Sequence, residues 1–297
     1  MAEIIPNPVK QEKPLARLAT RVGLSVIFLA CSLSIFLFGP NYYKLFPTNG
    51  NKYYATGLAA FFLVIALLLK FIPKLNRYWP IAYAFFIAST VILVSDLFAG
   101  YNTQFVRLFN VQTGTNPGMA LAKLYDALLV IVPILLLTLL SGEKLQTLFL
   151  KKGNQHWKWA WGIGALVLFN YLTSVLIFFG TSYQVSHLGS VILWGLVFAS
   201  SNSFLEELWF RGLFLKKLIP LVGVAGTIII SSFWFAALHF LSFAYLPVMV
   251  VPIFIVNTFT LGLACSVLML KTDNIWGAFL IHAAADLFLF IATLAIH

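Results

Sequence analysis

The stretch Ser203-Phe204-Leu205-Glu206-Glu207-Leu208-Trp209-Phe210-Arg211-Gly212 places two adjacent carboxylates and an arginine inside an otherwise apolar run. An ionisable side chain at the centre of a membrane-spanning helix costs at least ~2.5 kcal/mol, so it persists where it is paired, hydrated in a cavity or used in function. Glu207 and Arg211 are four residues apart and share a helix face, which predicts an ion pair between them. Glu206 is turned away from that pair by roughly 100°, so we expect it to stay free of Arg211.

The composition is typical of a polytopic membrane protein. The 297 residues are 61% hydrophobic and only 9% charged, and the mean hydropathy of +0.94 lies outside the range of soluble globular domains. The net charge of +10 comes from lysines and arginines that stand singly between apolar runs, which excludes nucleic acid as a partner. Cys31 and Cys265 also lie in apolar runs, without the spacing of a disulfide framework or metal site, and are predicted to be packing residues.

The fold class is predicted to be all-α, with about nine transmembrane helices. The expected spans are residues 22–39, 54–73, 79–99, 120–141, 159–180, 188–215, 222–245, 246–270 and 275–296. Only Pro247 and Pro252 interrupt the seventh and eighth spans, so a re-entrant segment there would reduce the count to eight. The chain then divides into a disordered cytoplasmic tail (1–21), N-terminal transmembrane helices (22–187) and a C-terminal helical core (188–297).

The basic residues predict how the chain is oriented in the membrane. Of the 19 lysines and arginines, 15 fall on the side of the N-terminus in the nine-helix arrangement, and four fall on the other: Lys44, Lys52, Arg107 and Lys123. This bias places the N-terminus in the cytoplasm and the C-terminus outside, and we expect the plasma membrane to be the location. The connection from Ser141 to Lys158 is interpreted as an interfacial amphipathic segment or, alternatively, a solvated loop.

Further polar side chains fall within apolar helices. His239 stands alone in such a helix, where a histidine indicates function more often than packing. His282 and Asp286 are four residues apart with only alanines between them, so they share a face that a neighbouring helix can approach closely. Asp96 and Asp126 fall near the outer ends of their spans, where interfacial water explains them.

Depth predicts which of these groups meet. At a rise of about 1.5 Å per residue, Glu206 lies roughly 15 Å and His282 roughly 13 Å from the cytoplasmic ends of their helices, so they can meet. His239 would lie roughly 25 Å deep, too far for the same site unless its helix tilts or begins late after Pro220.

The residues Glu206, His239, His282 and Asp286 are suited to hydrolysis. A carboxylate can take a proton from water, while imidazoles can orient that water, bind a metal or stabilise an oxyanion. No serine or cysteine stands beside a histidine at a strained turn, as a covalent nucleophile would require. Direct attack by water is therefore the simpler hypothesis.

The motifs resemble those of the CPBP family of intramembrane proteases, which includes the type II CAAX prenyl endopeptidases and bacterial Abi and bacteriocin-related proteins. Glu206-Glu207-x-x-x-Arg211-Gly212 is similar to the family's EExxxRG, Phe235-x-x-x-His239 to its FxxxH and His282-x-x-x-Asp286 to its HxxxN/D. The resemblance covers roughly residues 188–290 and implies that the helical core 188–297 is the catalytic part.

The resemblance also implies a role for each motif. Attacking water would be activated by Glu206 with His239, the tetrahedral intermediate stabilised by His282 with Asp286, and the site braced, or the substrate contacted, by Glu207 with Arg211.

Asp286 departs from the better-known prenyl endopeptidases, which carry asparagine there. An ionised aspartate cannot donate a hydrogen bond to an oxyanion. It would orient His282, act in its protonated form or ligate a metal. The cofactor is unknown; a Zn²⁺ ion would have Glu206, His239, His282 and Asp286 as its candidate ligands.

These observations favour an intramembrane endopeptidase that hydrolyses a peptide bond of a membrane-associated protein or peptide, from a cavity open to the cytoplasm. Its partners would be that substrate and the lipid bilayer. Two alternatives stay open. A proton-coupled transporter also needs buried carboxylates and histidines, and a non-catalytic immunity or scaffold protein could retain the same fold.

Overall fold

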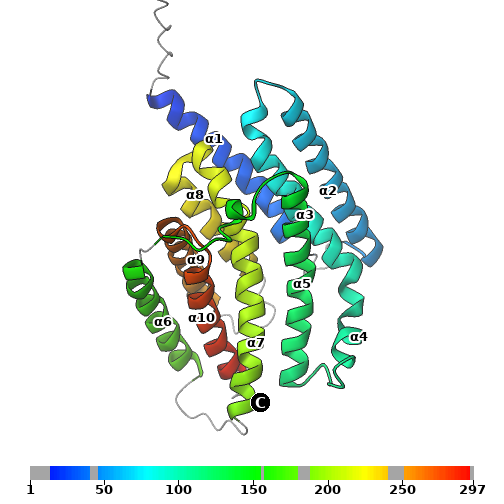
Figure 1. Ribbon diagram of the computed structural model, residues 1–297, viewed down its shortest axis with the longest axis vertical. Coiled ribbons are helices and arrows are strands. Elements are labelled where there is room, and N and C mark those ends of the chain that lie inside the picture. The colour runs from blue at the N-terminus through cyan, green and yellow to red at the C-terminus, as the bar shows by residue number, and fades with distance from the viewer. Residues whose placement is uncertain (1–13, 41–45, 155–156, 180–187, 240–250, 295–297) are drawn as a thin grey trace, which may run out of the picture.

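The computed structural model describes residues 14–40, 46–154, 157–179, 188–239 and 251–294, and all regular elements among them are helical (Figure 1). In chain order the elements are α1 (Pro14–Ser32), the π-helical η1 (Leu33–Leu37), α2 (Thr48–Phe71), η2 (Asn76–Tyr78), α3 (Trp79–Phe98), η3 (Ala99–Tyr101), α4 (Asn102–Arg107), α5 (Asn116–Leu140), η4 (Leu145–Leu148), α6 (Trp157–Phe179), α7 (Leu188–Glu206), the π-helical η5 (Glu207–Gly212), α8 (Leu215–His239), α9 (Val251–Thr272) and α10 (Trp276–Leu294).

The all-α class is confirmed and the protein is an integral membrane protein, but the count of nine spans is not confirmed. Six stretches among the described residues are long and apolar enough to cross a membrane: Leu18–Leu37, Gly50–Phe71, Asn76–Arg107, Asn116–Leu140, Leu215–His239 and Val251–Thr272. The apolar stretches of α6 and α10 are shorter. The re-entrant alternative concerned residues 222–270; their described parts belong to two helices long and apolar enough to span, Leu215–His239 and Val251–Thr272, while residues 240–250 lie outside the described residues.

The first helix begins earlier than predicted. α1 starts at Pro14, so residues 14–21 belong to this helix and not to the expected tail. Residues 1–13 of the expected tail lie outside the described residues.

α7 occupies the centre of the bundle and packs against α5 on one side and α10 on the other (Figure 1). The α2–α3 pair flanks α5, while α6 and α9 pack against α10. α7 and α10 approach closely at Gly195, where a Cβ atom would lie 2.7 Å from Cδ1 of Leu287. The acidic motif therefore lies at the end of a helix enclosed by both halves of the chain.

Ion pairs join three connections at one end of the bundle. Asp273, between α9 and α10, pairs with Lys151 and, at 3.0 Å, with Lys216 at the start of α8. Lys217 pairs with Glu143 at 2.9 Å. The charge pattern assigns these connections to one side of the membrane, and they do lie together. Which side is cytoplasmic stays a prediction.

The connection after α5 is anchored on the protein at Leu148 and Phe149 and is exposed at other positions before Asn154. Leu148 and Phe149 are fully buried, and the backbone N–H of Ile275 donates to the Phe149 carbonyl at 3.2 Å. Its leucines and phenylalanine cover the end of η5 and pack against the α9–α10 turn and the start of α8. Whether Ser141–Lys158 is an interfacial segment or a solvated loop stays a prediction.

Candidate active site

The acidic motif lies where a regular helix changes into a wider one. α7 ends at Glu206 and continues as the π-helical η5, where the N–H of Leu213 donates to the carbonyl of Leu208 at 2.9 Å. A π turn bonds residue i to i+5 and occurs frequently at functional sites. Angles counted at 100° per residue do not anticipate this wider turn.

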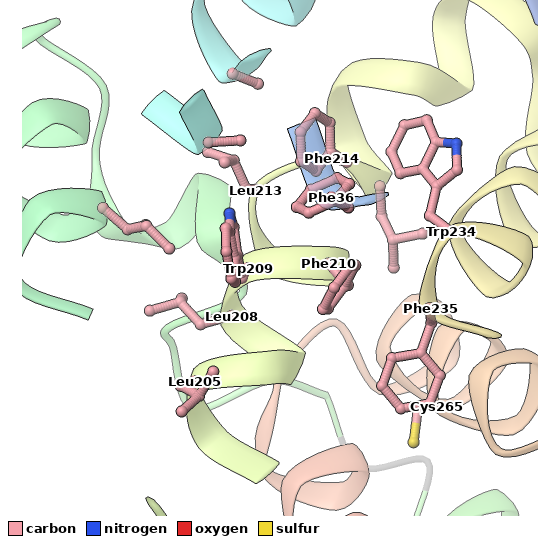
Figure 2. Close-up of a cluster of buried hydrophobic side chains, with 14 of the residues drawn as sticks. Phe36, Leu205, Leu208, Trp209, Phe210, Leu213, Phe214, Trp234, Phe235 and Cys265 are labelled. Carbon is pink, nitrogen blue, oxygen red and sulfur yellow. The ribbon is translucent and has the colours of Figure 1, made fainter. Parts of the chain in front are cut away.

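Aromatic packing holds one side of η5. Trp209 and Phe210 contact Phe36 of η1, with ring centres 5.2 and 4.8 Å away, and Phe210 also lies 5.6 Å from Phe235 of α8 (Figure 2). All four rings are buried. Since these large side chains occupy one side of η5, Glu207 and Arg211 are left to face α9 and α10.

Glu207, Arg211 and His282 form a fully buried cluster. Nη1 of Arg211 donates to Oε1 of Glu207 at 3.0 Å, which is the ion pair that the spacing predicts. The same Oε1 lies 2.8 Å from Nδ1 of His282 on α10. A carboxylate that is paired with arginine accepts hydrogen bonds, so Nδ1 of His282 carries a proton and donates it to Glu207, while Nε2 is left for other groups.

The guanidinium of Arg211 occupies a slot between α8 and α9. Its central carbon lies 4.1 Å from the ring centre of Phe235, a cation–π contact. A Cβ atom at Gly262 would lie only 2.9 Å from Nη2 of Arg211 and 3.0 Å from Cα of Ser232. Glycine at position 262 therefore makes room for the arginine.

Glu206 is the carboxylate that stays outside the ion pair. Its Oε2 lies 3.4 Å from Nε2 of His282, and no hydrogen bond from a described residue reaches this oxygen. Its side chain keeps 12% of its surface exposed, whereas that of Glu207 is fully buried. Part of the Glu206 side chain is therefore accessible from the cavity that it lines, although Oε2 itself is buried.

His239 ends α8 beside the same site. Its Nδ1 lies 2.8 Å from the carbonyl of Phe235, and because a carbonyl only accepts, Nδ1 donates and Nε2 keeps its lone pair. The Phe235 ring packs against both imidazoles, since its centre lies 4.4 Å from the ring centre of His239 and 5.4 Å from that of His282. α8 is kinked at Gly223, where φ is 82°. A tilted or late-starting helix was the condition under which His239 was expected to reach the site; α8 begins early, at Leu215, and its kink at Gly223 changes the direction of the segment that carries His239.

Asp286 approaches His282 at Nε2, the ring nitrogen that Glu207 does not contact, and has a partner that the sequence did not suggest. Its Oδ1 is 3.7 Å from Nε2 of His282, while its Oδ2 accepts a hydrogen bond from Nδ2 of Asn202 at 3.0 Å. Asn202 is one helical turn before Glu206 on α7. From the sequence, only this spacing of four residues from Glu206 could have indicated Asn202 as a site residue. The spacing does not indicate that Asn202 contacts Asp286 on α10.

A cavity of about 330 Å³ extends from Glu206 between α3, α5 and α7. Asn202 lines it beside Glu206, and its wall also includes Asp96, Lys123 and Asp126. The interpretation of Asp96 and Asp126 as groups merely hydrated at the interface is therefore incomplete. Both lie on the wall of the cavity that reaches the candidate catalytic carboxylate.

The cavity extends away from the end that the ion pairs close. Its outer wall comes from the start of α2, the end of α3 and the first turns of α5. The charge pattern places those segments outside the cytoplasm. In the predicted orientation this cavity therefore opens on the outer side of the membrane, and not to the cytoplasm as expected. On the cytoplasmic side of Glu206, the loops are packed over η5.

The candidate metal ligands do not form a metal site. Among the described residues, no group of three or more histidine, cysteine, aspartate and glutamate side chains is arranged to hold a metal ion. Nδ1 of His282 is also occupied by Oε1 of Glu207. The geometry gives no support to the Zn²⁺ alternative or to a metalloprotease.

Comparison with known families confirms the resemblance carried by the motifs. Residues 187–288 match the family described as Rce1-like, type II CAAX prenyl endopeptidase. This segment includes all six predicted site residues, from Glu206 to Asp286. At the level of the family, the match supports a membrane protease of the CAAX type. No curated protein and no solved structure gave a significant match to the chain.

Proposed function

We propose, on the premise that residues 187–288 have the Rce1-like family's architecture, that the protein is an intramembrane endopeptidase that cleaves its substrate by direct attack of water. The observation that carries the proposal is the position of Glu206. It is a buried carboxylate whose Oε2 accepts no hydrogen bond from a described residue, next to His282 and on the wall of a cavity.

Glu206 and His239 activate the water in this proposal. Oε2 of Glu206 and Nε2 of His239 both accept hydrogen bonds, and a water molecule has one hydrogen for each. As the water oxygen attacks the carbonyl carbon, Glu206 takes the proton. General-base catalysis of this kind contributes roughly 10²–10⁴-fold to the rate.

His282 stabilises the oxyanion that forms. Glu207 holds Nδ1, which fixes the ring and directs Nε2 toward the reacting groups. The protonated Nε2 donates to the oxyanion, and Arg211 keeps Glu207 in its ionised form. When the intermediate collapses, the C–N bond breaks and the proton on Glu206 passes to the leaving amine.

Asp286 and Asn202 position His282 from the opposite side. At 3.7 Å, Oδ1 of Asp286 attracts the charged imidazole without making a hydrogen bond to it. The hydrogen bond from Asn202 keeps that carboxylate away from the position of the water. Asp286 is therefore a positioning residue in this proposal, and neither a base nor a direct oxyanion donor.

Cleavage of a membrane-anchored reporter peptide by purified protein in liposomes tests the proposal. Glu206→Gln keeps the volume of the side chain and removes the proton acceptor, so we expect cleavage to fall by at least about 10²-fold with an unchanged melting temperature. Asp273→Asn is the matched control, since it removes a carboxylate distant from the site. Full activity of Glu206→Gln would contradict the general-base role.

The same liposomes discriminate the other classes of function. A proton-coupled transporter would dissipate an imposed pH gradient when its substrate is added and would cleave no reporter. A non-catalytic scaffold would do neither. Cleavage that disappears in Glu206→Gln and persists in Asp273→Asn is expected only of the protease.

A further inference from the structure

The far end of the cavity holds a polar pair on α2 and α3. Nδ2 of Asn51 donates to Oδ1 of Asp96 at 2.7 Å. This bond leaves Oδ1 of Asn51 and Oδ2 of Asp96 buried with no hydrogen-bond partner among the described residues. Asn51 is only 5% exposed, and both residues line the cavity that begins at Glu206. Two unused acceptors therefore belong to residues that line one cavity, and both oxygens are buried, so an occupant reaches them by a small movement of these side chains.

Buried acceptors without a donor are costly within a membrane, where no lipid group can replace water. One of the two is a carboxylate oxygen, so the group that satisfies both best is a positively charged donor. An ammonium or guanidinium group has several N–H bonds and can reach Asn51 and Asp96 together.

The charges along the cavity support a cation as its occupant. Lys123 and Asp126 lie three residues apart on α5 and carry opposite charges, so they balance one another. Asp96 and Glu206 then leave the lining with a net negative charge, although the whole chain carries +10. An acidic group would meet repulsion here, and an apolar group would leave the acceptors of Asn51 and Asp96 unsatisfied.

We propose that Asn51 and Asp96 bind the charged end of a lysine or arginine side chain of the substrate, which places a neighbouring peptide bond at Glu206. This inference rests on the proposed protease function and adds a substrate class to it. The cavity volume of about 330 Å³ lies at the lower end of the roughly 300–1,000 Å³ of ligand pockets. It accommodates one long side chain with its backbone more readily than a bulky group.

Matched reporter peptides test the preference. Lysine is moved through each position on both sides of the scissile bond, and methionine and glutamate replace it in parallel series. We expect one position at which lysine raises kcat/KM over methionine by about tenfold or more, the size expected for a charged hydrogen bond. Glutamate at that position should be cleaved more slowly than methionine.

Variants assign the preference to the cavity. Asp96→Asn should reduce the lysine-to-methionine ratio to about one, and Asp96→Glu should retain most of it. Asp96→Lys should reverse the order of lysine and glutamate. Asp273→Asn, which removes a carboxylate outside the cavity, should keep the wild-type ratio. Asn51→Leu should lower the ratio, because it removes one acceptor and keeps the volume similar.

The outcomes separate this inference from the proposed function. Cleavage without preference for a basic residue at any position, or a preference unchanged in Asp96→Asn, would overturn the inference and leave the protease proposal standing. If no peptide is cleaved, the protease proposal fails, and binding of the labelled lysine and methionine peptides to wild type and Asp96→Asn decides the inference. Equal dissociation constants would overturn it.

Discussion

Nδ1 of His282 lies 2.8 Å from Oε1 of Glu207, closer than any contact of this imidazole with Asp286, its neighbour one turn along the same helix. The histidine therefore depends on α7 and η5 more than on its own helix. Since Oε1 of Glu207 also accepts from Arg211, one oxygen atom joins the motif on η5 to the motif on α10.

Glu207→Gln should lower both stability and activity. The change leaves the guanidinium of Arg211 buried without its counter-ion, and breaking a buried pair in this way costs about 3–5 kcal/mol. The melting temperature of the purified protein should fall, in contrast to Glu206→Gln. Equal melting temperatures for the two variants would show that Glu207 has no bracing role.

Gly262→Ala should resemble Glu207→Gln, although residue 262 has no charge. Its new methyl group would lie 2.9 Å from Nη2 of Arg211 and 3.0 Å from the backbone of Ser232, so the arginine or α8 must move. We expect a loss of about 1–3 kcal/mol of stability together with a loss of cleavage. Gly277→Ala is the control on α10, because its methyl group would meet only the flexible side chain of Leu268.

Asp286→Asn should retain activity within about tenfold of wild type. Asparagine can still accept the hydrogen bond from Asn202, and as a neutral donor it can also serve an oxyanion. Chelators should leave the wild type active. Zinc content is measured beside the cleavage rates of both proteins; stoichiometric zinc that is lost together with activity in Asp286→Asn would establish the metal alternative instead.

Fusion reporters test the orientation of the chain. A reporter after His297 should be extracytoplasmic, and one inserted between Lys151 and Lys158 should be cytoplasmic. Both reporters on one side would contradict an odd number of spans. If the reporter after His297 is cytoplasmic and the inserted one extracytoplasmic, the orientation in the membrane is opposite to the predicted one. The open end of the cavity would then face the cytoplasm.

The ion pairs of Asp273 should depend on pH. Burial raises the pKa of this carboxyl, but hydrogen bonds from Lys151 and Lys216 outweigh that effect and hold the pKa below its ordinary value. A carboxylate of this kind stabilises the fold above about pH 4 and loses its contribution as the pH falls through the lowered pKa. The melting temperatures of wild type and Asp273→Asn should differ slightly at neutral pH and converge in acid. A gap that persists in acid would point to packing rather than charge.

Two relations within the site could be predicted, one between partners on a single helix and one from the depth of two residues on different helices. A separation of four residues places Glu207 against Arg211, and this pair forms at 3.0 Å, because helix geometry fixes the distance whatever surrounds it. Depth counted along α7 and α10 also placed Glu206 and His282 at one level, and they lie 3.4 Å apart.

Relations between helices were decided only by tertiary packing. The spacing of His282 and Asp286 suggested a pair, yet η5 offers His282 a closer carboxylate, and Asp286 is held by Asn202 of α7. Asp96 is near the end of its span and was assigned to the interface. Its side chain instead faces inward, since α2 and α5 pack against α3 and enclose the cavity there.

The sequence by itself indicated the all-α membrane fold, the resemblance that the family match over residues 187–288 supports, and the six candidate site residues, because hydropathy, helical spacing and motif order are local properties of the chain. The tertiary structure decided which carboxylate His282 binds, where the cavity leads and which further residues line it. These depend on the rotation of each helix about its axis and on the π turn after Glu206, both of which follow from how Phe36, Phe210 and Phe235 pack between distant segments.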